Sequence, residues 1–269
     1  MQLLRLGLIG LLCGFCCDAQ AALVVCADPN NLPFSNRQEA GFENRLAYIL
    51  ARALHTDVRY EWWAQRRGFA RNTLSQSRCD IWPGVASGIH SMATSTPYYR
   101  STYVFVSLQS EPMAHLSLDD PRLRELLIGV QLVGDDGMNT PPASALSDRG
   151  ITANVRGFTL YGDYRRPDPP TAILDAVVSH AVAVALVWGP LAGYYAKRSP
   201  VPLRLQPISA APESPSPMSF AISVGVRRTE PQLLAQINGA LQRHAPEIQR
   251  LLGQYGVPLL ANDATHSDP

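Results

Sequence analysis

The sequence predicts an α/β protein made of two doubly wound lobes with a central cleft, joined by two chain crossings. Short apolar runs typical of strands alternate with segments whose apolar residues recur at helical spacing. The chain has 269 residues, of which 46% are hydrophobic and 17% are charged, which suffices for two lobes of ordinary size. A polar break at 109–112 and a later strand at 220–226 indicate where the chain passes between the lobes.

The first lobe is expected to contain residues 22–108 and 220–262. Leu46, Ile49 and Leu50 recur on one helical face and predict a helix over 43–54. Apolar and aromatic runs predict strands at 23–27, 58–63, 80–85, 103–108 and 220–226, and helical patterns occur at 68–74 and 231–252. Pro246 predicts a break in the last helix, because proline interrupts the hydrogen bonds of a helix interior.

The second lobe is expected to span 109–219. Acidic residues open a predicted helix over 119–127, where they favour the positive end of the helix dipole. Strands are predicted at 128–133 and 182–188, the second apolar enough to be buried on both faces, and helices at 170–180 and from Gly189 onward. A Pro/Ser stretch at 210–217 predicts a loop, and 263–269 a loose tail.

The first 21 residues have the features of a secretory signal peptide. Arg5 precedes an apolar run at 6–13, and Ala19 and Ala21 fit the small-x-small cleavage rule. The apolar run is too short to span a membrane. We therefore expect a mature protein that begins near Ala22, is exported to the periplasm and has no membrane span.

Cleavage would leave two cysteines, Cys26 and Cys79. Two cysteines in an oxidising compartment usually pair, and a bridge enclosing roughly 50 residues stabilises a protein by about 3–4 kcal/mol in the loop-entropy model. Two buried free thiols are the alternative. The mature chain has no Cys-x-x-Cys motif, which disfavours redox chemistry.

Polar and aromatic residues follow several predicted strands, at the ends where open α/β sheets bind ligands. The loop after the first strand contains Asn30, Asn31 and Phe34. The other residues predicted to contact a small-molecule ligand in the cleft are Glu43, Trp63, Arg67, Gly84, Ser87, Asp135, Asn139, Thr140, Trp188 and Gly189. Structural roles are the alternative: proline and asparagine build turns, aromatic side chains fill cores, and acidic residues cap helices.

Motifs for catalysis, metals and cofactors are lacking. The six histidines are scattered without zinc-ligand or haem-attachment spacing, and no nucleophile elbow, phosphate loop or dinucleotide fingerprint occurs. The net charge of +1 does not suggest a nucleic-acid partner. We expect a non-enzyme with no cofactor and no metal; an enzyme that would lose turnover on changing Glu43 or Asp135 stays open as an alternative.

A series of short strings, taken in order, resembles one family over nearly the whole mature chain. The strings lie at 26–36, 41–43, 62–69, 98–105, 128–132, 134–137, 139–142, 161–164, 187–194 and 225–228. They resemble the quinoprotein dehydrogenase-associated periplasmic solute-binding proteins of the MxaJ/XoxJ type, within the type II periplasmic binding proteins (bacterial solute-binding protein family 3). The resemblance implies an accessory protein for a PQQ-dependent methanol or alcohol dehydrogenase, with that enzyme and its c-type cytochrome as partners.

The same resemblance bears on the ligand. Amino-acid binders of this type hold the ligand carboxylate with an arginine soon after the third strand, and 84–92 contains none. Arg66, Arg71 and Arg100 are possible substitutes, as is Arg67. The stretches at 86–91 and 179–181 also depart from the family pattern. An importer receptor for a small non-amino-acid solute is therefore the alternative function.

Overall fold

The computed structural model describes residues 21–66, 68–132, 139–159, 169–209 and 216–261, and nearly all of the predicted signal peptide and all of the predicted tail lie outside these ranges. The strands are β1 (Leu23–Ala27), β2 (Asn30–Asn31), β3 (Ser35–Asn36), β4 (Val58–Trp62), β5 (Ile81–Ala86), β6 (Ala93–Thr94), β7 (Tyr99–Leu108), β8 (Ile128–Leu132), β9 (Val155–Thr159), β10 (Val184–Trp188), β11 (Leu203–Pro207) and β12 (Ser219–Val226). The helices are α1 (Phe42–Ala53), α2 (Phe69–Asn72), α3 (Pro141–Asp148), α4 (Ala172–Val178), α5 (Gly189–Ala196), α6 (Pro231–Arg243) and α7 (Ala245–Gln254), with short 3₁₀ turns at Leu74–Gln76, Pro121–Arg124 and Pro169–Thr171.

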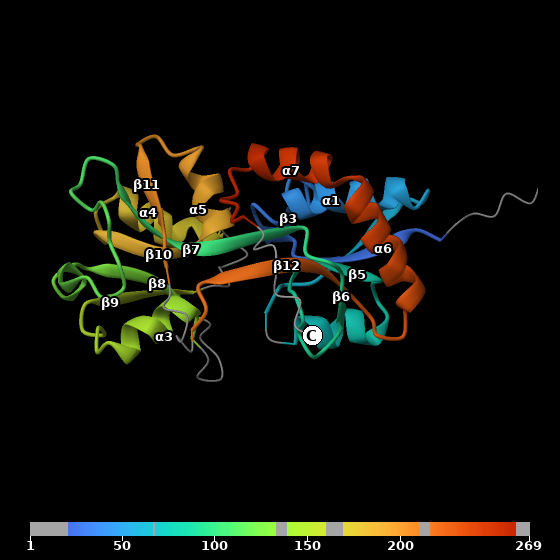
Figure 1. The fold of residues 1–269 in the computed structure, drawn as a ribbon, viewed down its shortest axis with the longest axis horizontal. Helices are drawn as coiled ribbons and strands as arrows, with labels where there is room; N and C mark the ends of the chain where they lie inside the picture. Colours follow the sequence, from blue (N-terminus) through green and yellow to red (C-terminus); the bar gives the residue numbers. More distant parts are fainter. Residues whose placement is uncertain (1–20, 67, 133–138, 160–168, 210–215, 262–269) are drawn as a thin grey trace, which may run out of the picture.

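One large mixed sheet runs through the molecule, with helices on both of its faces (Figure 1). Its strand order is β4-β1-β5-β12-β7-β10-β8-β9, with β6 beside β12 and β11 beside β7. β1 pairs in parallel with β4 and β5, and β8 pairs in parallel with β9 and β10. These two parallel groups form the two halves of the molecule, and they confirm the predicted α/β fold class with doubly wound halves.

The two central strands, β7 and β12, connect the halves. The first part of β7 pairs with β12 at Tyr99–Thr102, and its second part pairs with β10 from Tyr103 onward (Figure 1). Both pairings are antiparallel. The chain therefore passes between the halves inside β7, before the polar break at 109–112. The lobe limits at 108 and 219 stay a prediction.

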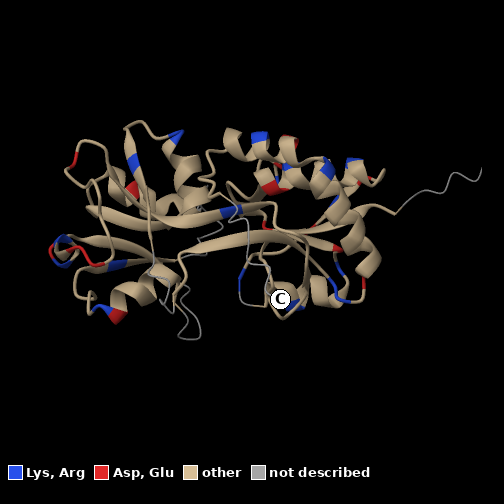
Figure 2. Cartoon of the chain, in the orientation of Figure 1, with Lys and Arg blue, Asp and Glu red and all other residues tan. Residues whose placement is uncertain are grey.

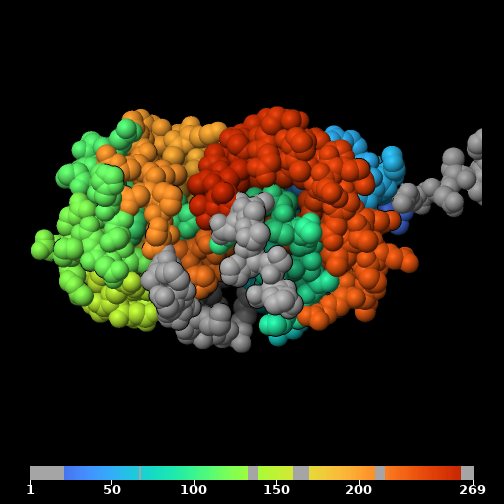
Figure 3. All heavy atoms as spheres, in the orientation of Figure 1, coloured from blue at the N-terminus to red at the C-terminus, as the bar shows by residue number. Residues whose placement is uncertain are grey.

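The first half packs its sheet between two apolar clusters. On one face, α1 contributes Phe42, Leu46 and Leu50, all at most 1% exposed, to a core shared with α6 and α7. In the space-filling view α6 and α7 form a continuous outer surface over this half (Figure 3). On the other face, Cys26 and Cys79 form a disulfide with Cα atoms 5.4 Å apart, which confirms their predicted pairing.

The second half also has a core on each face of its sheet. β10 is buried along Val184–Val187 because it lies between β7 and β8, as its continuous apolar run predicts. Ala185 and Val187 face the cluster that includes α4 and α5, whereas Val184 and Leu186 face the cluster that includes α3. Charged residues are scattered over both halves of the chain (Figure 2).

Several local predictions differ from the structure. The helix expected over 119–127 is only the 3₁₀ turn Pro121–Arg124, because Ile128 already bonds to the carbonyl of Asn154 and starts β8. The helix expected over 68–74 is divided into α2 and the turn Leu74–Gln76. The strands β9 and β11 were not predicted from the sequence. The predicted break in the last helix is confirmed, because α6 ends at Arg243 and α7 begins at Ala245.

Candidate functional site

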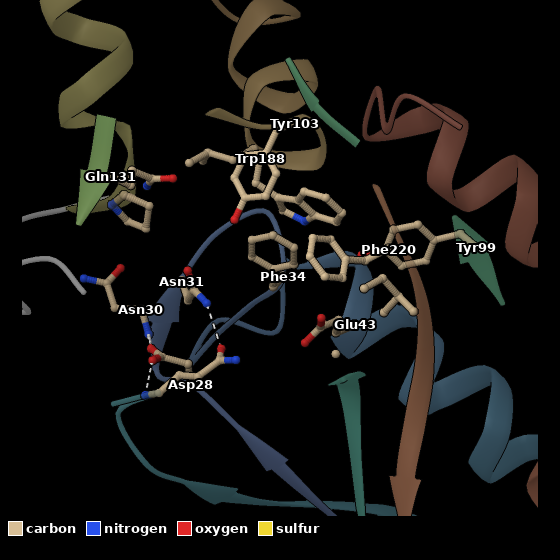
Figure 4. Close-up of a pocket in the computed structure, with 15 residues that line it drawn as sticks. Asp28, Asn30, Asn31, Phe34, Glu43, Tyr99, Tyr103, Gln131, Trp188 and Phe220 are labelled. Atoms are coloured by element: carbon tan, nitrogen blue, oxygen red, sulfur yellow. Dashed lines mark hydrogen bonds between the residues drawn. The ribbon is translucent and has the colours of Figure 1, made fainter. Parts of the chain in front are cut away.

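A cavity of about 270 Å³ lies where the two halves meet (Figure 4). Its walls come from the loop after β1, from the central strands β7 and β12, and from the ends of β8 and β10. The residues that line it are Asp28, Asn30, Asn31, Phe34, Glu43, Gln65, Gly84, Tyr99, Tyr103, Gln131, Pro170, Trp188, Leu191, Phe220 and Ile222. Its position matches the general rule that ligands bind beyond the carboxyl ends of strands in open α/β sheets.

Three aromatic rings from three strands form one wall of this cavity. Tyr103 and Trp188 are register partners of β7 and β10, and their ring centroids lie 5.2 Å apart in an edge-to-face arrangement. Phe220 of β12 lies 5.9 Å from Trp188 and 6.5 Å from Tyr103, also edge to face. Burial raises the pKa of Tyr103 to about 12, so its hydroxyl is neutral at physiological pH. We call Tyr103, Trp188 and Phe220 the aromatic wall.

The loop after β1 is fixed by the buried carboxylate of Asp28. One of its oxygens accepts a hydrogen bond from the backbone N–H of Asn30 at 2.8 Å, and the other accepts one from that of Gln65 at 2.6 Å. The side-chain amide of Asn31 donates to the Gln65 side chain at 3.0 Å (Figure 4). Asp28 thus joins the loops that follow two neighbouring parallel strands, β1 and β4.

Glu43 presents a buried carboxyl group from the first turn of α1. The residue is 8% exposed, and no described residue forms a hydrogen bond with its side chain. Burial, with the nearby charge of Asp28 as a smaller cause, raises the pKa of Glu43 from 4.5 to about 8. The carboxyl group is therefore mostly protonated at neutral pH and has a proton to donate. It lies against Gly84, where an added Cβ would be 2.2 Å from its Oε1 atom.

Gln131 occupies the end of β8 and faces the cavity (Figure 4). It is 2% exposed, and its side-chain Nε2 has no hydrogen-bond partner among the described residues. Its backbone carbonyl accepts a bond of 2.6 Å from the Thr140 hydroxyl. A buried donor without a partner is costly in a folded protein.

The structure brings some of the predicted cleft residues together. Those that line the cavity are Asn30, Asn31, Phe34, Glu43, Gly84 and Trp188. Ser87 is exposed and bonds to Ser223 and to the carbonyl of Ala221, and Asn139 is exposed, so both lie away from the lining. Arg67 and Asp135 lie outside the described residues.

Three other predicted residues have different surroundings. Thr140 lies behind the cavity, where it holds the backbone of Gln131. Gly189 packs against β7, and an added Cβ would be 2.5 Å from the carbonyl oxygen of Thr102. Trp63 is 37% exposed, with the guanidinium of Arg78 5.8 Å from its ring.

Several lining residues were not identified from the sequence. Asp28, Gln65 and Gln131 are polar residues at or just after the ends of β1, β4 and β8, so position alone could have indicated them. Tyr99, Tyr103, Phe220 and Ile222 lack such a signal, because they belong to the two central strands and do not follow the carboxyl end of a strand. Their approach depends on the antiparallel pairing of those strands, which the local sequence does not encode.

Within the described ranges, no three His, Cys, Asp or Glu side chains gather as metal ligands would. In the same ranges, every helix is too short or too polar to cross a membrane.

Comparison with known proteins identifies the relatives. No family model matches the chain. The protein MoxJ of Methylorubrum extorquens AM1 is 30% identical over 251 residues, which cover 88% of this chain and 81% of that protein. The crystal structure of the periplasmic binding protein XoxJ from Methylobacterium extorquens AM1 is 35% identical, with a TM-score of 0.73 over 90% of this chain and 100% of that one. The crystal structure of MxaJ from Methlophaga aminisulfidivorans MPT is 27% identical, with a TM-score of 0.74 over 89% of this chain and 100% of that one.

These relatives agree with the resemblance seen in the ordered strings of the sequence, and their folds agree with the two halves joined by β7 and β12. The similarity extends over the cavity-forming strands as well as the helices around them. The chain therefore belongs to the MoxJ/MxaJ/XoxJ family of periplasmic binding proteins and has the type II periplasmic binding protein fold.

Proposed function

We propose that the protein is a non-catalytic periplasmic accessory of a PQQ-dependent methanol or alcohol dehydrogenase, exported by removal of its first 21 residues. The observation that carries this proposal is membership of the MoxJ/MxaJ/XoxJ family at 30% identity over most of the chain. The resemblance on which the expectation rests links such proteins to the dehydrogenase and its c-type cytochrome. The role would be to assist activation of the enzyme or its coupling to the cytochrome.

The cavity supports a role other than amino-acid transport. Neither lysine nor arginine is among the described residues that line it, whereas a fork of guanidinium donors is the usual means of holding a carboxylate. Glu43 also lacks a hydrogen-bonded base or nucleophile among the described residues, which favours binding over catalysis.

The edge of the sheet at β4 offers a surface for the dehydrogenase. β4 ends the strand order, and its last residue, Trp62, has the guanidinium of Arg37 5.8 Å from its ring. The next residue, Trp63, is covered in the same way by Arg78, which also pairs with Glu61 at 3.3 Å. Tryptophan and arginine are enriched at the centres of protein interfaces. We define these two tryptophan–arginine pairs as the β4 surface.

Direct binding tests the proposal. The mature protein, residues 22–269, would be immobilised and titrated with a purified PQQ alcohol dehydrogenase, alone and with its cytochrome. We expect saturable binding that Trp63→Ser weakens about tenfold or more, whereas Leu127→Ser, which removes a side chain 46% exposed on the other half, has no effect. Absence of binding to the dehydrogenase in both conditions would reject the accessory role.

A receptor of an importer is the second candidate, and the cavity between the halves is the observation that favours it. Receptors of this kind close around their solute by hinge motion. Small-angle scattering would then show a smaller radius of gyration with the solute than without it, and no dehydrogenase would bind. The accessory role predicts dehydrogenase binding whether or not the cavity is filled.

A further inference from the structure

We propose that residues 253–260, which we call the strap, hold the two halves of the molecule in one orientation. The strap consists of the end of α7 and the chain that follows it, and it lies against α5 of the other half (Figure 1). This inference goes beyond the proposed function, because it concerns the conformation of the protein alone. It rests on where the strap is anchored and on its line of contact with α5.

The strap begins in the apolar core of the first half. Leu252 and Val257 are 0% and 6% exposed in the core that α7 shares with α1 and α6. Between them the chain turns at Gly256, whose φ of +72° favours glycine. The N–H of Val257 donates to the carbonyl of Leu252 at 3.1 Å, which ends the helix and fixes the direction of the strap.

The far end of the strap is bound to β7. The hydroxyl of Ser101 donates to the carbonyl of Pro258 at 2.6 Å, and the N–H of Leu260 donates to the carbonyl of Arg100 at 2.9 Å. Both residues of β7 lie in the part of that strand that pairs with β12, before the chain passes to the second half. The strap is therefore held by the first half at both of its ends.

Two glycines let the backbone of α5 approach the strap. An added Cβ on Gly189 would lie 3.1 Å from the ring of Pro258, and one on Gly193 only 1.9 Å from the carbonyl oxygen of Gly256. Glycine is unfavourable inside a helix, and this close approach accounts for it at position 193. Backbone atoms in direct contact cannot move apart by a change of rotamer, so a small shift of α5 would disturb the contact.

Two side chains of α5 extend the contact to the end of α7. The ammonium group of Lys197 donates to the carbonyls of Gly253 and Gln254 at 2.7 and 3.1 Å, where the helix dipole favours a cation. The ring of Tyr194 stacks on that of Tyr255, with centroids 5.9 Å apart and an angle of 15° between the planes. A lysine of the second half thus caps a helix of the first.

The contact between α5 and the strap is a line and not a point. Gly189, Gly193 and Lys197 are spaced by four residues, so they share one face of the helix over about 12 Å. Rotation of the second half about β7 and β12, as in hinge closure, would open this line. Because α5 starts directly after Trp188 and its Leu191 lines the cavity, the strap also fixes one wall of the cavity.

Distances between spin labels test the orientation of the halves. The mature protein would be labelled on the cysteines of Tyr48→Cys in the first half and Leu127→Cys in the second, at positions 44% and 46% exposed, with the native disulfide left intact. Double electron–electron resonance measures the distribution of distances between the two labels. We expect one narrow distribution in the absence of any ligand.

Variants of the contact connect this orientation to the strap. We expect Gly193→Ala and Lys197→Met each to widen the distribution about twofold or more, because each removes part of the line of contact. Gly253→Ala is the matched control and should leave the distribution unchanged, since its added Cβ meets nothing within 4 Å and its carbonyl still accepts from Lys197. Far-UV circular dichroism would establish that each variant is folded; Lys197→Met changes an exposed side chain and decides if Gly193→Ala does not fold.

The proposal is overturned if the parent protein gives two distances or a broad distribution, because the halves would then move although the strap is present. It is equally overturned if the folded variants give the same distribution as the parent protein. Neither outcome bears on the accessory role, which is tested by binding of the dehydrogenase, so failure of one proposal is distinguishable from failure of the other.

Discussion

At the scale of single residues, Glu43 and Gly84 form a complementary pair. Folding buries the Glu43 carboxyl group without a basic partner among the described residues, and its pKa rises to about 8 as a result. The carboxyl group occupies the space that a side chain at position 84 would take. The strand β5 therefore has a glycine here to make room for a polar group aimed at the cavity, although glycine in a strand interior is normally unfavourable.

Replacement of Gly84 by alanine should displace Glu43. The new Cβ would be 2.2 Å from Oε1, so we expect Gly84→Ala to lower the free energy of unfolding by about 1–3 kcal/mol. Gly253→Ala is the matched control, because that added Cβ meets nothing within 4 Å and alanine favours a helix. Urea unfolding measures both. An equal loss of stability in the two variants would show that the contact with Glu43 is not the cause.

The buried carboxyl group should also make stability depend on pH. The folded pKa of Glu43, about 8, exceeds its ordinary value of 4.5, so the unfolded chain loses this proton first. The stability that the neutral form contributes is fully present below about pH 4.5 and is lost as the pH rises through about 8. Glu43→Gln cannot ionise there. We expect the free energy of unfolding of this variant, relative to that of the parent protein, to increase with pH across this window, as measured by urea unfolding at several pH values. A difference in free energy that stays constant with pH would contradict the raised pKa.

At the scale of secondary-structure elements, prediction succeeded where one pattern dominates. The helical spacing of Leu46 and Leu50 predicted α1, and the unbroken apolar run of β10 predicted a strand buried on both faces. The start of β7 was not predicted, because Arg100, Ser101 and Thr102 are polar there. Their polarity is satisfied by tertiary contacts: the Ser101 hydroxyl donates to the carbonyl of Pro258, and that of Thr102 to the carbonyl of Met218.

The candidate site shows the same limit. The loop residues Asn30, Asn31 and Phe34 could be predicted, because they follow the first strand directly. The aromatic wall could be predicted only in part, since it needs Tyr103 and Phe220 to come from strands distant in sequence. Local patterns indicate which strands form, whereas the pairing of β7 with β10 and β12 decides which side chains meet.

The disulfide is the covalent connection between β1 and the segment before β5. It joins Cys26 to Cys79 across 53 residues, a span that includes α1, β4 and α2. The loop-entropy model predicts that Cys26→Ser or Cys79→Ser lowers the free energy of unfolding by about 4 kcal/mol. Urea unfolding with and without a thiol reductant measures the effect. We expect the reductant to destabilise the parent protein and to leave the double serine variant unchanged; no effect on the parent would contradict the role of the bridge.

At the scale of the whole molecule, β7 and β12 have two roles at once. They connect the halves, and they supply the cavity with Tyr99, Tyr103, Phe220 and Ile222. The Tyr103–Trp188–Phe220 contacts run across the same junction. A ligand on the aromatic wall would therefore contact the strands that determine how the halves are joined.

This shared sheet predicts that the molecule unfolds as one unit. Neither half has a complete sheet without β7 and β12, because β7 is bonded to β12 at one end and to β10 and β11 at the other. Loss of one half would expose the buried strands of the other, so unfolding should be cooperative.

We expect one urea transition by far-UV circular dichroism and by tryptophan fluorescence, which senses Trp82 in one half and Trp188 in the other. Phe42→Ala and Leu186→Ala, from the cores of the two halves, should each shift that single transition by about 2–5 kcal/mol. Two transitions, each moved by only one of the variants, would instead show that the halves unfold independently. The junction through β7 and β12 would then not couple their unfolding.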